Sequence, residues 1–140
     1  MYLLDTNVIS GARVRTREPR LQRWLRITPA SALYTAASVL AEIEQGVRRL
    51  ENRDASAGAM LRAWFDFSVL RTYGSDQRAL PFDLAAARIY ATFPVPERAP
   101  SDDAHIAAIA VANGLIVVTR NVKHFEPLGV RTLNPWEWSS

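Results

Sequence analysis

One apolar run, Leu-Ile-Val-Val-Thr at residues 115–119, constrains the fold of this chain more than any other segment. It follows Asn113-Gly114, a pair that is typical of the end of a helix. Its apolar side chains do not alternate with polar ones, which indicates a strand that is covered on both faces. Such strands are characteristic of parallel sheets packed between helices. The run therefore predicts an α/β protein.

The rest of the chain alternates between strand and helix patterns. Further strands are predicted at residues 2–4, 32–36 and 78–82, and short elements at 123–125 and 130–133. Helices are predicted over 13–26, from the cap Ser38 to a break at 52–54, over 55–70, after Asp83, and over 101–113. This rhythm predicts a three-layer α/β/α fold with a mainly parallel central sheet. The length of 140 residues suits one domain spanning residues 1–140.

The composition limits the kind of site that the chain can build. It has 49% hydrophobic and 22% charged residues, as an ordinary globular protein does, and no cysteine. A metal would therefore be held by oxygen atoms or by the histidines His105 and His124, and oxygen ligands favour Mg²⁺ or Mn²⁺. Neither a secretion signal nor an apolar run near the roughly 20 residues that cross a bilayer is present. We therefore expect a cytoplasmic protein without a membrane partner.

The charge is weakly informative about partners. The formal net charge is +3, and Lys123 is the single lysine among 17 basic residues. Arginine binds phosphate and carboxylate in a bidentate manner, so the bias fits a nucleic acid or an acidic protein as partner. Arginines that merely cover solvated helix faces explain the bias equally well.

Two polar residues follow predicted strands directly. Asp5 comes after strand 2–4, and Asn121 comes just after strand 115–119. Ligands of open α/β sheets bind at the carboxyl ends of the strands, so both residues are candidates for a site. Asp5 could instead cap a following turn, and Asn121 could simply form one.

Two acidic candidates lie on predicted helices. Glu42 flanks an apolar stripe, and its neighbours one turn away, Ser38 and Gly46, are small enough to leave the carboxylate accessible. Asp102 and Asp103 begin the helix after the proline-rich segment 93–100, on the two edges of one apolar face, so periodicity does not choose between them. An exposed helix acid and a favourable helix dipole are the simpler explanations. Three acids and an amide at such places are nevertheless hard to explain as independent caps.

The motifs that contain these residues resemble those of PIN-domain nucleases, in order and spacing, along essentially the whole chain. They are Leu-Leu-Asp-Thr-Asn-Val-Ile-Ser at 3–10, Ala41-Glu42 with Gly46, Leu-Pro-Phe-Asp at 80–83, Asp103 with Ile106-Ala107-Ala108, Val-Thr-Arg-Asn at 118–121, and Asn-Pro-Trp at 134–136. Within the family, the chain is most similar to the VapC and FitB type of toxin from bacterial toxin–antitoxin operons.

The resemblance implies a role for each candidate. Asp5, Glu42 and Asp103 would be the metal-binding and catalytic acids, which selects Asp103 over Asp102, and Asn121 would complete the catalytic set. Thr6 and Thr119 would orient carboxylates or the attacking water. His124 lies three residues after Asn121, at a position where family members often have Asp. The charge on this side of the metal site is therefore left open.

The implied activity is metal-dependent endoribonuclease cleavage of RNA by a toxin that uses Mg²⁺ or Mn²⁺. The implied partner is a VapB-like antitoxin, which alone contacts operator DNA, in addition to homodimers and toxin–antitoxin hetero-oligomers. Arg13, Arg15, Arg17 and Arg120 are candidates for contacting phosphate. Candidates for a partner groove or dimer face are Trp24, Leu61, Trp64, Phe65 and Phe67, although core packing is favoured for most of them.

Two alternatives stay open: an inactive PIN-fold interaction module, and a DNA-directed nuclease with the same metal site. A phosphatase of the haloacid dehalogenase type also begins with an apolar strand and Asp. It requires a second Asp two positions later, where this chain has Asn7. We therefore set it aside.

Overall fold

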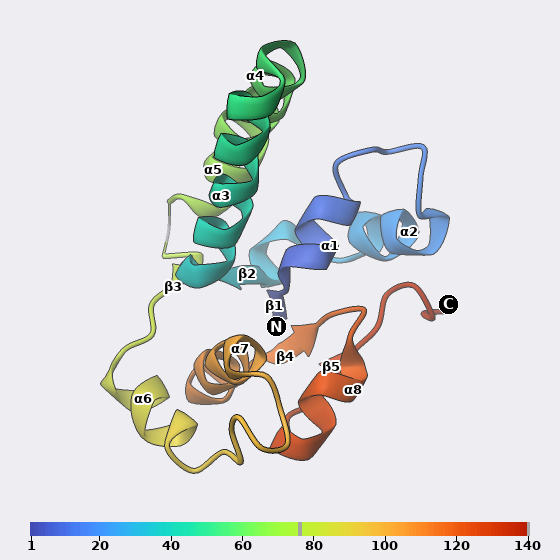
Figure 1. Cartoon of the computed structure of the whole chain (residues 1–140). Helices are drawn as coiled ribbons and strands as arrows, with labels where there is room; N and C mark the ends of the chain where they lie inside the picture. The colour runs from blue at the N-terminus through green and yellow to red at the C-terminus, as the bar shows by residue number, and fades with distance from the viewer. Residues whose placement is uncertain (76, 140) are drawn as a thin grey trace.

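The computed structural model describes residues 1–75 and 77–139, and its described strands form one parallel sheet (Figure 1). The strands are β1 (Tyr2–Leu4), β2 (Leu33–Ala36), β3 (Ala79–Leu80), β4 (Ile116–Val118) and β5 (Thr132–Leu133), in the order β3-β2-β1-β4-β5. Leu4 at the end of β1 is in register with Thr35 of β2 and Val118 of β4. The predicted parallel sheet is confirmed.

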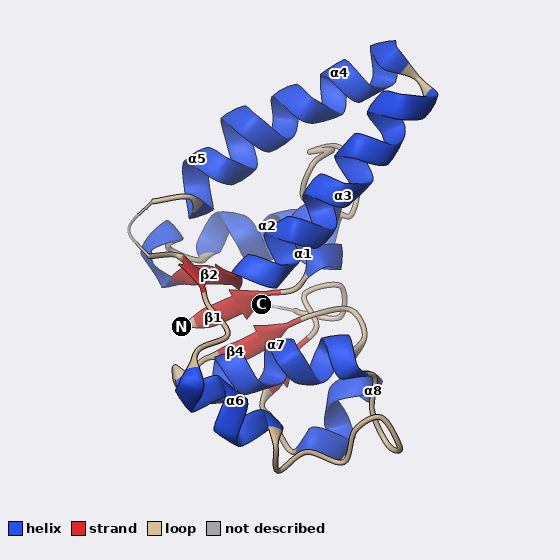
Figure 2. Cartoon of the chain, turned by 60° about the vertical axis from the view of Figure 1, so that its left-hand side comes forward, coloured by secondary structure: helices blue, strands red, loops and turns tan. Residues whose placement is uncertain are grey.

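Helices cover both faces of this sheet. They are α1 (Thr6–Gly11), α2 (Pro19–Ile27), η1 (Ala30–Ala32), α3 (Ala37–Arg53), α4 (Ala55–Trp64), η2 (Phe65–Val69), α5 (Leu70–Tyr73), α6 (Leu84–Tyr90), α7 (Ser101–Ala112), α8 (Val122–Phe125) and η3 (Glu126–Leu128). The chain moves one way across the sheet from β1 to β3 and the other way through β4 to β5. Because crossovers between parallel strands are right-handed, α1–α5 and α6–α8 lie on opposite faces, as Figure 2 shows. The predicted three-layer α/β/α architecture is confirmed.

The start of the chain differs from the prediction. The sequence predicts only a turn after Asp5, but helix α1 begins there, because the Asp5 side chain accepts a hydrogen bond from the Thr6 amide and caps the helix. The helix predicted over 13–26 begins only at Pro19, after Glu18 in a left-handed conformation. Proline favours the first turn of a helix, so the arginine-rich segment before it is not helical.

Helix α3 also begins earlier than predicted. Ser38 lies inside the helix, and Ala36, the last residue of β2, occupies the N-cap position without a side-chain hydrogen bond. The strand passes directly into the helix, so no residue is left for a cap of the usual kind. The predicted break at 52–54 is confirmed: Asp54 separates α3 from α4, and its side chain accepts a bond from the Ala57 amide.

Helices α3 and α4 form an antiparallel arm that projects from the sheet in Figure 1. The two helices approach closely at Gly58, where a Cβ atom would lie 2.4 Å from the Glu51 Cα. Arg62 of α4 donates hydrogen bonds to Glu44 and Glu51 of α3 at 2.8–3.1 Å. Backbone contact and ion pairs thus hold the arm together and fix the direction of α3, which carries Glu42.

Helix α7 is buried on almost every side. Six of its residues are buried, namely Ala104, Ile106, Ala107, Ala108, Ile109 and Ala110, and the helix packs against α6 and β4. The small alanine side chains allow this close approach and place the start of α7 near the carboxyl end of β4. In the part of the chain that the structure describes, no helix is both long and apolar enough to cross a membrane.

Candidate functional site

The candidate site lies where the strand order of the sheet reverses. Chain connections leave β1 and β4 in opposite directions, which opens a crevice between the carboxyl ends of these neighbouring strands. Asp5 follows β1 and Thr119 follows β4. The amide of Asp5 donates a hydrogen bond to the Val118 carbonyl at 3.0 Å, so the two strand ends are joined at this point.

Asp5 lies at the centre of a hydrogen-bond network and is only 5% exposed. Its Oδ1 accepts from the Thr6 amide, and its Oδ2 accepts from the Thr119 hydroxyl, both at 2.8 Å. The same hydroxyl accepts a hydrogen bond from the backbone amide of Asn121 at 3.1 Å. Thr119 therefore connects the carboxylate after β1 to the loop after β4.

Burial raises the pKa of the Asp5 carboxyl above its ordinary value, although its hydrogen bonds to Thr119 and Thr6 oppose the shift. The negative charges of Asp103 and Glu42 raise this pKa further. The three predicted acids are thus close enough to repel one another. Within the described residues, no cationic side chain forms a salt bridge with Asp5.

Glu42 approaches the crevice from the arm. It lies on the second turn of α3, is exposed, and its Oε2 accepts a hydrogen bond from the Thr6 hydroxyl at 2.7 Å. Because the Thr6 amide also binds Asp5, this threonine contacts both acids. The structure thus brings together Asp5 at the N-cap of α1, Thr6 of α1 and Glu42 of α3.

The structure distinguishes the two acids at the start of α7. The Asp103 side chain is 16% exposed and its Oδ2 lies 2.9 Å from His124 Nδ1, whereas Asp102 is exposed. Burial raises the pKa of Asp103, as do the charges of Asp102 and Glu42, while His124 opposes the shift. Asp103 is therefore the more buried of the two acids, and it is the one whose charge raises the pKa of Asp5.

Two asparagines lie at the ends of the strands that border the crevice: Asn7 in the first turn of α1 and Asn121 in the loop after β4. Asn121 is exposed and is the N-cap residue of α8. Asn7 was not among the predicted site residues, yet its Oδ1 accepts from the Arg120 amide at 3.1 Å, and its Nδ2 lies 3.4 Å from Asp5 Oδ2. The signal in the sequence was its place in the motif Asp5-Thr6-Asn7, directly after a strand. Asn7 thus joins the first turn of α1 to the loop after β4.

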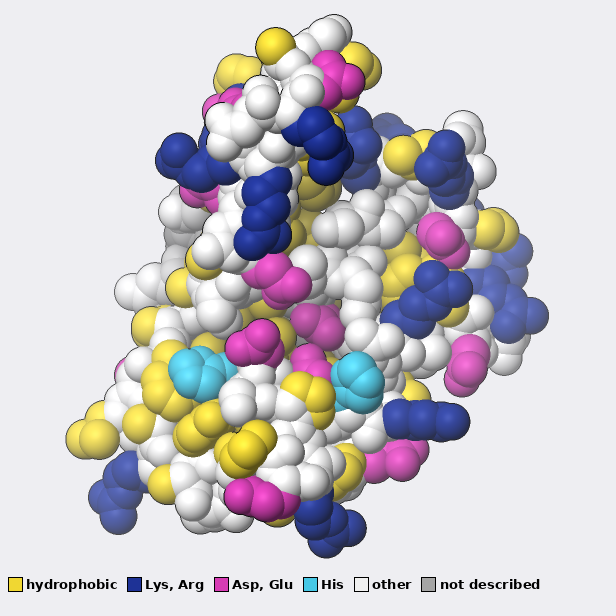
Figure 3. All heavy atoms as spheres, viewed as in Figure 1, with side chains coloured by type: hydrophobic (Ala, Val, Ile, Leu, Met, Phe, Trp, Pro, Cys, Tyr) yellow, Lys and Arg dark blue, Asp and Glu magenta, His cyan; other side chains and the backbone are white. Residues whose placement is uncertain are grey.

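The side chains at this site have the chemistry of a magnesium site without being arranged around one point. Among the described residues, no three His, Asp or Glu side chains are close enough together to hold an ion. Glu42 is turned toward Thr6, and Asp103 toward His124. Both carboxylates would have to rotate before they could bind one ion together with Asp5. Figure 3 shows acidic side chains gathered between the arm and α7 at the middle of this face.

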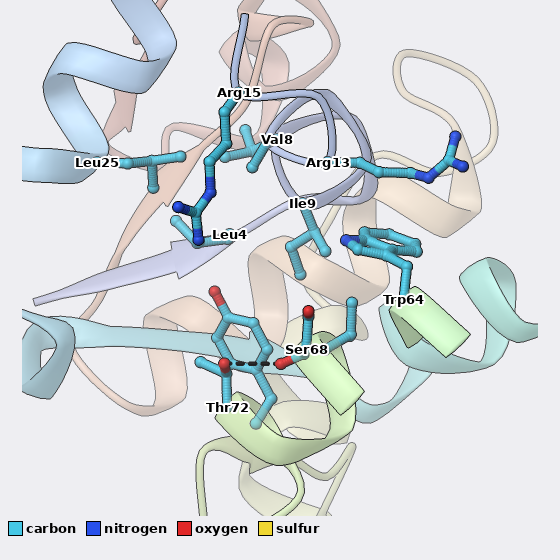
Figure 4. Close-up of a pocket in the computed structure, with 12 residues that line it drawn as sticks. Leu4, Val8, Ile9, Arg13, Arg15, Leu25, Trp64, Ser68 and Thr72 are labelled. Carbon is cyan, nitrogen blue, oxygen red and sulfur yellow. Dashed lines mark hydrogen bonds between the residues drawn. The ribbon is translucent and has the colours of Figure 1, made fainter. Parts of the chain in front are cut away.

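A separate hollow of about 210 Å³ lies beside α1 and the arm (Figure 4). Its lining includes Leu4, Ile9, Leu25 and Trp64, and the guanidinium of Arg15 extends over it. We call it the α1 hollow. An apolar lining with a cationic side chain above it suits a segment of a protein that is apolar and acidic.

The predicted partner-facing residues fall into two groups. Trp24 and Phe65 are buried in the core, whereas Leu61 and Trp64 line hollows and Phe67 is 66% exposed. Leu61 and Trp64 are partly buried and also pack against the core, so core packing accounts for most of the five, as expected, and Phe67 is the exception. Trp64 lines both the α1 hollow and a second hollow that Thr6 and Glu42 also line.

A parallel sheet with carboxylates from separate elements at its switch point defines an α/β protein with an acidic site of the kind that metals occupy. The model of the PIN domain matches residues 2–127, so the chain belongs to the PIN domain family. The resemblance seen in the sequence is confirmed.

Similar proteins cover nearly the whole chain. VapC ribonuclease Y4jK of Sinorhizobium fredii is 32% identical, over 98% of this chain and 99% of that protein. Toxin FitB of Neisseria gonorrhoeae is 33% identical, over 97% and 99%. The crystal structure of FitAcB from the same species has a TM-score of 0.87 at 31% identity and covers 99% of this chain and 100% of that one.

Proposed function

We propose that this protein is a metal-dependent endoribonuclease that acts as the toxin of a VapBC-type toxin–antitoxin pair. The observation that carries the proposal is the buried Asp5 at the switch point of a PIN-family sheet, with Glu42 and Asp103 near enough for their charges to raise its pKa. The similarity to a VapC ribonuclease and to toxin FitB supports it.

The proposed cofactor is Mg²⁺, which Mn²⁺ could replace, held by the carboxylates of Asp5, Glu42 and Asp103. A bound divalent ion supplies hydroxide near neutral pH and stabilises the charge that develops on phosphorus. The chain's own residues set the geometry: Thr119 holds Asp5, and Thr6 holds Glu42. We assign Asn121 as the fourth residue of the catalytic set, because its exposed side-chain amide can contact substrate or water.

Arg13 is the best supported of the predicted phosphate-binding arginines. It lines a hollow together with Thr6 and Glu42, and Arg49 of α3 lines the same hollow. Arg120 instead places its guanidinium 5.0 Å from the centre of the Trp136 ring. We therefore propose that Arg13 and Arg49 bind the phosphate backbone near the acids.

The decisive experiment is cleavage of a mixed pool of structured RNA by the purified protein in Mg²⁺, Mn²⁺ or EDTA. Asp103→Asn is expected to abolish cleavage while leaving the circular dichroism spectrum unchanged. Glu97→Gln is the control for charge, because it removes an exposed acid that lines none of the hollows described here, and it is expected to keep metal-dependent cleavage. Equal rates in EDTA and Mg²⁺, or full activity of Asp103→Asn, would contradict the proposal.

The same assay separates the alternatives. A DNA strand of identical sequence that is cut as fast as the RNA would indicate a DNA-directed nuclease. A folded protein that cuts neither and causes no growth arrest on expression would indicate an inactive interaction module.

We further propose a VapB-like antitoxin as the partner, with operator DNA contacted only through it, and assembly into homodimers and toxin–antitoxin hetero-oligomers. The apolar lining and the arginine of the α1 hollow support a protein segment as its occupant. Light scattering of the protein alone and of the complex purified with its antitoxin tests the stoichiometry.

A further inference from the structure

Two more hollows meet at helix α3. One, of about 480 Å³, lies between α3 and helices α6 and α7, and we call it the α7 hollow. The other, of about 470 Å³, lies between α1, α3 and α4, and we call it the arm hollow. Glu42 and Arg49 line both. A ligand that extends from one hollow to the other must therefore pass a proposed catalytic acid and an arginine.

The α7 hollow has an aromatic wall. Tyr90 of α6 and His105 of α7 both line it, with ring centres 5.0 Å apart and planes at 77°. Behind them, Phe82 stacks on His105 with centres 4.0 Å apart and planes 10° from parallel. Phe82 also packs edge-on against Tyr90 at 5.8 Å. The three rings support one another, so the wall is held in place before any ligand arrives.

The two hollows differ in charge. The α7 hollow is lined by the carboxylates of Glu42 and Asp102, which repel a phosphate but accept hydrogen bonds from amino groups. The arm hollow is lined by Arg13 and Arg53 in addition to Arg49. Phosphate is therefore favoured on the arm side of Glu42, and a flat group with hydrogen-bond donors on the α7 side.

We propose that the α7 hollow is a nucleobase-binding subsite for single-stranded RNA, and that Arg49 binds the adjoining phosphate. The proposal rests on the proposed ribonuclease function and specifies how its substrate is held. Unpaired bases of RNA are commonly bound by stacking on aromatic side chains and by hydrogen bonds to their edges. Here Tyr90 and His105 provide the stacking surface, and Asp102 and Gln45 provide polar groups for the base edge.

The test measures binding rather than cleavage, so that it does not depend on the nuclease proposal. Full-length protein in EDTA is titrated into a short fluorescein-labelled single-stranded RNA of mixed sequence, and anisotropy is followed at several salt concentrations. Tyr90→Ala is expected to weaken binding by about tenfold, and Tyr90→Phe to retain it, because stacking requires only the ring. The salt dependence should not change in either variant.

Arg49→Ala should behave differently. It is expected to weaken binding and to reduce the slope of log affinity against log salt by about 0.7, the value for one phosphate of a single strand. Arg88→Ala removes an exposed arginine of α6 and is the matched control for charge. A slope change in Tyr90→Ala, or none in Arg49→Ala, would overturn the assignment of base and phosphate to these residues.

Abasic substitutions in the RNA test the same contact without any change in the protein. With the wild-type protein, one abasic position should lower affinity about as much as Tyr90→Ala does. With Tyr90→Ala, the same position should cost nothing further, since the two changes remove one contact. The proposal would be overturned if the two losses of affinity were additive, or if no abasic position lowered the affinity. It would also be overturned if Tyr90→Ala abolished binding of the antitoxin but not of RNA. Absence of metal-dependent cleavage together with the expected binding would count against the nuclease alone.

Discussion

Asp5 has two structural roles at once, because its two oxygen atoms face different partners. Oδ1 caps α1 through the Thr6 amide, and Oδ2 accepts from the Thr119 hydroxyl. The cap and the site, which the sequence presents as alternatives, are thus the same arrangement. Oδ2 also accepts a longer hydrogen bond from Asn7 Nδ2 at 3.4 Å, whereas Oδ1 accepts only from the Thr6 amide among the described residues and has a lone pair left for a cation.

The raised pKa of Asp5 predicts how a metal stabilises the protein at different pH values. The folded, cation-free protein binds this proton more tightly than the unfolded chain does. This contribution to stability is therefore present at low pH and is lost as the pH rises through the folded pKa. Mg²⁺ competes with the proton, so it should raise the melting temperature more at about pH 7 than at about pH 4. Differential scanning calorimetry in Mg²⁺ and in EDTA measures the difference.

The corresponding control is Asp5→Asn, which removes the titrating group while keeping its size. Its melting temperature should depend far less on Mg²⁺ at either pH. An equal response of the wild-type protein at both pH values would show that Asp5 does not bind the cation.

Thr119 provides a second test at the level of one residue. Thr119→Val keeps the shape of the side chain but removes the hydroxyl that contacts Asp5 and the Asn121 amide. Leaving buried polar groups without a partner should lower the free energy of unfolding by about 1–3 kcal/mol. Urea denaturation measures this loss, and the rate of RNA cleavage should fall as well. Thr119→Ser restores the hydroxyl and should recover most of both, whereas a valine variant of wild-type activity would exclude the positioning role.

Among the elements, the arm depends on close backbone packing between α3 and α4. At Gly58 a Cβ atom would meet the backbone of Glu51, whereas at Gly46 of α3 nothing lies within 4 Å. Gly58→Ala should therefore push the helices apart and destabilise the protein by about 1–3 kcal/mol. Gly46→Ala is the matched control and should stabilise the helix by about 0.5–1 kcal/mol. Denaturant titrations of both variants give the comparison, and equal effects would contradict this account of the arm.

Helix α7 gives its two acids, Asp102 and Asp103, different surroundings that the spacing of its apolar residues does not predict. Its buried residues leave almost no polar face, so the pattern of apolar positions does not distinguish its two acids. The contacts with β4, α6 and α8 decide that Asp103 is half-buried beside His124 and that Asp102 is exposed.

For the molecule as a whole, the cationic side chain over the α1 hollow predicts how a partner associates. Arg15 is exposed and extends over the apolar lining in Figure 4. Arg15→Glu should slow association with the antitoxin by about tenfold at low salt, with a smaller effect on dissociation. Stopped-flow or surface plasmon resonance measurements give both rates. Arg88→Glu on α6, on the other face of the sheet, is the control, and an equal effect of both changes would indicate a general effect of charge.

Much of the architecture follows from local patterns in the chain. The apolar run 115–119 predicts a strand in a parallel sheet, and β4 occupies residues 116–118 within it. Asn113 and Asp54 end or separate helices as expected, because caps and breaks depend on neighbouring residues. Local patterns do not predict α1, because Asp5 fits a turn cap as well as a helix cap and the arginine-rich segment after Gly11 has a helical pattern of its own.

The sequence alone determined which residues are candidates: an acid directly after a strand, an acid on the flank of a helix, and a pair of acids at a helix start. Tertiary structure decided which of them meet. Asp5 and Thr119 become neighbours because β1 lies beside β4 in register, and Thr6 reaches Glu42 because α1 packs on α3. The aromatic wall of the α7 hollow and the bridging position of Asn7 arise in the same way. Contacts between residues far apart in the chain depend on strand order and helix packing, which no local pattern specifies.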